Sequence, residues 1–71
     1  MGVSLDETAK RVRESRERAG LTPEDAASQS GMTPETWRQW EAGSDSPDFS
    51  EGMRAARVLG VNPTWLVTGE K

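Results

Sequence analysis

The tripeptide Thr-Pro-Glu occurs twice in this chain of 71 residues, at positions 22–24 and 33–35, and it constrains the fold more than any other feature. In each copy the Thr suits a helix N-cap, the Pro suits the first helical position, and the carboxylate faces the positive end of the helix dipole. Gly31 lies between the two copies, where a helix is expected to end. The spacing therefore predicts one short helix, a tight turn and a second helix.

Similar start and stop signals divide the rest of the chain. Ser4 with Glu7 and Asp48 with Glu51 fit capping boxes, and the sequence at 62–63 reads Asn-Pro, a cap followed by a first-position proline. Glycines at 20, 31, 43, 60 and 69 fall where helices should end, and no strand-like alternation competes. These signals predict an all-α protein, a compact five-helix bundle forming a single domain over residues 1–71. The expected helices span about residues 5–19, 23–30, 34–42, 49–59 and 63–68.

Helical spacing also predicts the core. Small Ala26 and Ala27 on the second helix, opposite the large Trp37 on the third, indicate that the indole fills the volume that the alanines leave. The apolar residues expected to face inward are Leu5, Ala9, Val12, Ala26, Ala27, Trp37, Trp40, Met53, Ala56, Val58, Leu59, Trp65 and Leu66.

Composition narrows the function classes. The chain has no Cys and no His, which excludes disulfides and thiol nucleophiles and removes the usual ligands of zinc and iron. No paired carboxylates suggest acid-base chemistry, so we predict no catalytic residues, no metal, no cofactor and no enzyme activity. The sequence has neither a long apolar run nor a signal-peptide pattern, and we expect a soluble cytoplasmic protein that does not enter a membrane.

Two short helices joined by a tight turn form a helix-turn-helix, which commonly presents its second helix to the DNA major groove. The chain resembles lambda-repressor-like domains of the phage-repressor and Cro type (the XRE family) along nearly its whole length. The matching positions are residues 12–22, Ala27, Gly31, Thr36, residues 40–41, Gly43, Pro47, Ala56, residues 59–61 and residues 63–69. The resemblance implies a helix-turn-helix fold with helix 34–42 as recognition helix, sequence-specific binding of a double-stranded DNA operator, and transcriptional control such as repression.

The resemblance also implies a structural ion pair between Arg16 on the first helix and Glu41 near the end of the third. Both are lone charges on otherwise apolar stripes, which fits a partly buried pair. The alternative is two unrelated, solvated charges.

The exposed face of the recognition helix supplies the candidate DNA contacts. The amide of Gln39 can pair with adenine, the carboxylate of Glu35 can accept from the cytosine amino group, and Thr36 can contact a thymine methyl or a phosphate. Thr33 lies at the start of the same face, and Arg38 at its side is the best phosphate-binding candidate.

Arg11 and Arg13 on the first helix could add contacts to the DNA backbone. For each of these seven residues the alternative is an ordinary solvated side chain.

Two features oppose DNA binding. Pro23 stands where the family usually carries a Gln that binds the DNA backbone, and residues 20–51 contain seven acidic residues but one basic residue, Arg38. The alternative function is therefore a protein-interaction module whose acidic face on the second and third helices meets a basic protein partner. A possible homodimer fits operator binding, and the apolar segment 65–67 could pack on a second copy. The alternative, ordinary core, is favoured for Trp65 and Leu66, whereas Val67 is more open.

Overall fold

The structure, a computed structural model, describes residues 5–70, so the proposed cap Ser4 lies outside the described residues. Five helices follow one another: α1 (Leu5–Arg18), α2 (Pro23–Gln29), α3 (Pro34–Glu41), α4 (Phe49–Leu59) and α5 (Pro63–Thr68). Each predicted boundary agrees with the structure to within one residue, and no strand occurs among the residues described. The all-α, five-helix prediction is confirmed. No helix in this part of the chain is long and apolar enough to cross a membrane.

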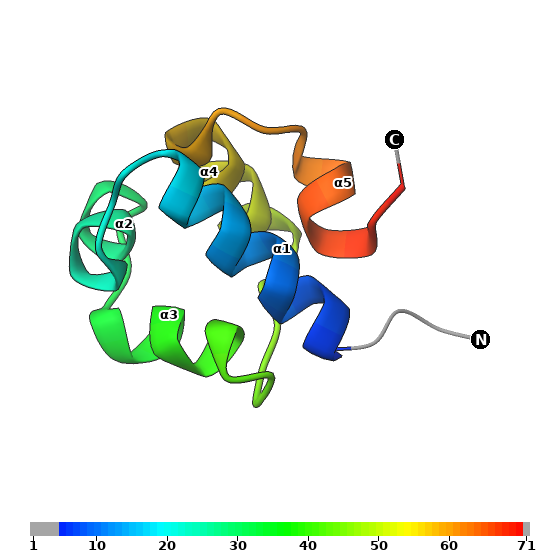
Figure 1. The fold of residues 1–71 in the computed structure, drawn as a ribbon, viewed down its shortest axis with the longest axis horizontal. Helices are drawn as coiled ribbons and strands as arrows, with labels where there is room; N and C mark the ends of the chain where they lie inside the picture. Colours follow the sequence, from blue (N-terminus) through cyan, green and yellow to red (C-terminus); the bar gives the residue numbers. More distant parts are fainter. Residues whose placement is uncertain (1–4, 71) are drawn as a thin grey trace.

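The helices α2 to α5 follow one another around the molecule, and α1 lies across them. Figure 1 shows α3 along the lower edge, α2 at the left, α4 behind at the top and α5 at the right, with α1 crossing in front. The packing pairs agree, because α2 contacts α3 and α4, α5 contacts α4, and α1 contacts α3 and α5. The exposed side of α3 and the outer side of α4 therefore belong to different faces of the molecule.

The two Thr-Pro-Glu copies form the N-termini of α2 and α3, as predicted. The hydroxyl of Thr22 accepts a hydrogen bond from the backbone N–H of Asp25 at 3.1 Å, and that of Thr33 accepts from the N–H of Thr36 at 3.2 Å. Between the helices Gly31 has a φ of +74°, a left-handed conformation that favours glycine. The twin caps and this turn fix the direction in which α3 leaves α2.

The remaining helices begin with the predicted caps as well. Asp48 and Glu51 form a reciprocal capping box, in which each carboxylate accepts the backbone N–H of the other residue. The side chain of Asn62 accepts from the N–H of Trp65 at 3.1 Å. A chain this small buries a limited core, so these local bonds matter to its stability.

The core is assembled around two tryptophans. The rings of Trp37 and Trp40 lie with centroids 5.1 Å apart at an interplanar angle of 46°. Ala26 and Ala27 are buried in the same cluster as Trp37, which agrees with the predicted packing. The buried cluster consists of Val12, Ala26, Ala27, Trp37, Trp40, Ala55, Ala56, Leu59 and Leu66.

The prediction for α4 was wrong at Met53, whose side chain is 45% exposed. The buried residues of α4 are instead Gly52, Ala55, Ala56 and Leu59, so the part of this face near Met53 is lined by small residues. A Cβ on Gly52 would lie 2.6 Å from Cγ2 of Val67, so α5 approaches α4 too closely for a larger residue.

Three other core predictions have different outcomes. The side chain of Leu5 lies outside the described part of the structure. Val58 is half-buried, and Trp65 is half-buried against the core cluster.

Candidate nucleic-acid interface

The face of α3 predicted to read DNA is open to solvent. Glu35, Arg38 and Gln39 are exposed, whereas Thr36 is half-buried. The hydroxyls of Thr33 and Thr36 lie 3.0 Å apart and form a hydrogen bond, so the N-terminal cap also orients Thr36. The structure thus brings five of the seven predicted DNA-contacting residues onto one short helix and its cap.

The guanidinium of Arg38 is not free on this face. Its Nη2 forms an ion pair with Oε2 of Glu24, which lies in the first turn of α2. Both side chains remain largely in solvent, at 58% and 52% exposure, so water and salt screen the pair and it contributes little to stability. Sequence reasoning missed this pair because it depends on how α2 and α3 pack, and no spacing rule links residues fourteen positions apart.

The structure contains the predicted ion pair between Arg16 and Glu41, the second pair that joins two helices. This pair is much less exposed to solvent than Arg38–Glu24. Arg16 Nε donates to Glu41 Oε2 at 2.6 Å and its Nη2 donates to Oε1 at 3.0 Å, while both side chains are 12% exposed. The Nη1 of Arg16 donates to the carbonyl of Leu21 at 2.8 Å, and the indole N–H of Trp37 donates to Glu41 at 2.6 Å. This network joins α1, the α1–α2 turn and α3, and so fixes α3 against the body of the domain.

The hydrogen bonds that Arg16 donates to Glu41 raise the pKa of Arg16 above its ordinary value, against the lowering effect of burial. A raised folded-state pKa gives stability that is fully present below the unfolded value and is lost as the pH rises through the folded value. Titration of Arg16 therefore leaves stability unchanged throughout the neutral range.

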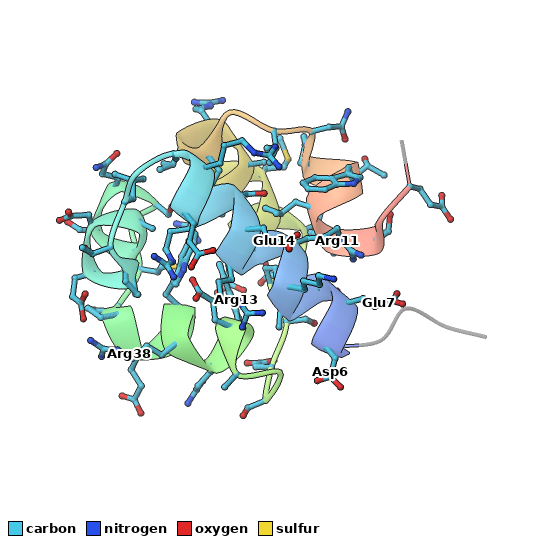
Figure 2. All side chains as sticks on the ribbon, in the orientation of Figure 1. Asp6, Glu7, Arg11, Arg13, Glu14 and Arg38 are labelled. Carbon is cyan, nitrogen blue, oxygen red and sulfur yellow. The ribbon has the colours of Figure 1, made fainter. Side chains whose placement is uncertain are left out.

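Arg11 has a structural role that the sequence did not suggest. Its Nε donates to the carbonyl of Leu66 at 3.1 Å, and its Nη2 donates to the carbonyl of Val67 and to the hydroxyl of Thr8, both at 3.2 Å. Figure 2 shows Arg11 on the α5 side of α1, whereas the exposed Arg13 lies on the side of the molecule that α3 occupies. Arg11 thus binds carbonyls in the last turn of α5, whereas Arg13 remains exposed to solvent.

The acidic residues of the segment 20–51 divide into two groups. Three of them have internal uses, because Glu41 is paired with Arg16 while Asp48 and Glu51 cap α4. The other four, Glu24, Asp25, Glu35 and Asp45, are exposed, although Glu24 is paired with Arg38 and Asp45 accepts the backbone N–H of Ser46. Across residues 5–70, no three His, Cys, Asp or Glu side chains gather closely enough to hold a metal ion. The exposed surface of α2 and α3 is acidic, but less so than the count of acidic residues in the sequence indicates.

Comparison with known proteins agrees with this geometry. Residues 2–66 match the family model described as a helix-turn-helix domain, which covers most of the chain. The chain therefore belongs to the helix-turn-helix domain family.

Among solved structures, the chain is similar to the restriction-modification controller protein C.AhdI from Aeromonas hydrophila. The TM-score is 0.83 at 27% sequence identity, over 89% of this chain and 91% of that chain. No curated protein matches the chain significantly.

Proposed function

We propose that the chain is a DNA-binding regulator of transcription that places α3 in the major groove of a duplex operator. The observation that carries the proposal is the solvent-facing row of polar side chains on a helix whose direction is fixed by its cap and by the Arg16–Glu41 network. Membership of the helix-turn-helix family and the similarity to a controller protein support a regulatory use. Control by repression, through sequence-specific contacts, is the finer form of the proposal.

The contacts divide by chemistry. Gln39 and Glu35 are the base-reading candidates, because an amide can pair with adenine and a carboxylate can accept from cytosine. Arg38 and Arg13 are the phosphate candidates, and Thr33 and Thr36 lie at the end of α3 that would enter the groove first. Binding requires Arg38 to leave Glu24 and contact a phosphate instead. Because the pair is exposed, breaking it costs little free energy.

A homodimer on a two-fold operator is part of the proposal. A single domain of this size buries little surface on DNA, and two half-sites multiply the affinity. Half-buried Trp65 borders a shallow hollow shared with Arg18, Val61 and Asn62, and this is the surface that we assign to a second copy. Val67 is a weaker candidate, because it packs against Gly52 within the same chain.

The test is fluorescence anisotropy with a random-sequence duplex at low salt, repeated as salt is raised. A DNA-binding surface gives micromolar binding that collapses with salt, because neutralised phosphates release counterions. Absence of binding at the lowest salt would contradict the proposal. It would favour the second candidate, a protein-interaction module whose exposed Glu24, Asp25 and Glu35 meet a basic partner.

A further inference from the structure

The outer face of α4 carries the largest exposed apolar side chains among the residues described. Phe49 is 70% exposed and Met53 is 45% exposed, one helical turn apart. Neither contributes to the core, which uses the opposite face of α4. An aromatic ring and a methionine held side by side in solvent are typical of protein contact surfaces.

This face borders a groove of about 510 Å³ between α4 and the end of α2. The groove includes the turn residue Gly31 and its neighbour Ser30 at the end of α2. Phe49 and Met53 form the apolar edge of the groove. Its lining residues are Gln29, Ser30, Gly31, Phe49, Ser50, Met53, Arg54, Arg57 and Val58.

The charge of the groove is uniformly positive. Arg54 and Arg57 line it, no acidic residue does, and neither arginine forms an ion pair or hydrogen bond within residues 5–70. Nη1 of Arg54 lies 3.6 Å from where a Cβ on Gly31 would be, so its guanidinium extends across the groove toward the turn. In a chain with a net charge of −3, two unpaired arginines beside exposed apolar groups form a distinct surface.

We propose that this groove binds an acidic, apolar segment of another protein. Carboxylates of the segment pair with Arg54 and Arg57, and its apolar side chains pack on Phe49 and Met53. A symmetric contact with a second copy would place four arginines together with no carboxylate on the face, which disfavours that occupant. The groove contains no residue of α3, and Figure 1 places α4 away from α3, so the partner does not cover the proposed DNA-reading face.

The test uses a fluorescein-labelled synthetic peptide with Leu and Glu at helical spacing, and a matched peptide with Lys in place of Glu. Anisotropy should detect binding of the Glu peptide alone, weakened as salt is raised. Arg54→Glu and Arg57→Glu should each weaken it at least about tenfold, and Phe49→Ser about as much. Lys10→Glu, a matched charge reversal on exposed α1, should leave it unchanged. All four sites are exposed, and circular dichroism verifies the fold of each variant.

Amide chemical shifts of ¹⁵N-labelled protein then locate the peptide. Shifts confined to α4 and residues 29–31 support the proposal. Equal binding of the Lys peptide, or equal weakening by Lys10→Glu, overturns it. It is also overturned if rising protein concentration alone moves the same amides, since a second copy then covers the face, or if duplex DNA competes with the peptide, since the arginines then bind phosphate.

Discussion

Two Arg–Glu pairs connect α3 to a neighbouring helix, and they differ in nearly every physical respect. Arg16–Glu41 is 12% exposed on each side, is bidentate, and shares its carboxylate with the indole of Trp37. Arg38–Glu24 uses one guanidinium nitrogen and is more than half exposed. Because the first pair is buried, breaking it costs much free energy. Because the second pair is exposed, Arg38 can exchange its carboxylate partner for another at little cost in free energy. The same chemistry therefore fixes α3 to α1 through one pair and leaves Arg38, the one arginine of α3, able to change partners in the other pair.

The largest expected effect is on the buried pair. Glu41→Ala leaves the guanidinium of Arg16 and the indole N–H of Trp37 without their acceptor, and it should lower the free energy of unfolding by about 3–5 kcal/mol. Urea unfolding followed by tryptophan fluorescence measures the loss. Glu35→Ala, an exposed Glu on the same helix, is the matched control and should cost less than about 1 kcal/mol. Equal losses for the two variants would remove the distinction between the pairs.

A conservative change at each arginine sharpens the comparison. Lys cannot reproduce the planar fork with which Arg16 reaches both oxygens of Glu41 and the carbonyl of Leu21. Arg16→Lys should therefore lower the free energy of unfolding by about 1–3 kcal/mol.

Arg38→Lys should leave the free energy of unfolding within about 0.5 kcal/mol of wild type, because its pair is exposed. Thermal unfolding of the two variants side by side provides the measurement. A larger destabilisation from Arg38→Lys would mean that the exposed pair is structural.

The next largest expected effect is the loss of DNA affinity when Arg38 is removed. As a phosphate contact, Arg38→Ala should weaken binding to all duplex sequences by about tenfold, or about 1.4 kcal/mol, and reduce the salt slope by about one. Anisotropy with several duplexes over a salt series measures both quantities. A loss limited to one base position would instead make Arg38 a base-reading residue.

The smallest expected effect is the change in DNA affinity when Glu24, the ion-pair partner of Arg38, is replaced. Glu24→Gln removes the competing carboxylate and should raise DNA affinity by about twofold to fivefold, the range expected from an exposed pair. Asp25→Asn removes a neighbouring exposed charge that Arg38 does not contact, and its gain should be smaller. In an Arg38→Ala background, Glu24→Gln should gain no more than Asp25→Asn. A full gain there would show that general repulsion, not release of Arg38, limits binding.

The two pairs also mark what the sequence could and could not predict. Helix boundaries could be predicted from the sequence because caps and terminal glycines are local signals, as at Thr22 and Gly31. The pair Arg16–Glu41 could be predicted because a lone charge on an apolar stripe needs a partner, and the family resemblance supplied the pairing.

The pair Arg38–Glu24 and the bonds from Arg11 to α5 depend on helix packing, which no local pattern encodes. The sequence analysis placed Met53 in the core because its side chain is large and apolar, and so missed its exposure. The structure instead buries Gly52, where Val67 of α5 leaves no room for a larger side chain.

Chemical-shift mapping of ¹⁵N-labelled protein with a random-sequence duplex at low salt tests most directly whether α3 is the DNA-binding element. Amides from Thr33 to Gln39 and in the first turn of α2 should move, and the movement should reverse as salt is added. Unmoved α3 amides, or shifts confined to α4 and residues 29–31, would contradict the assignment of α3 as the recognition helix.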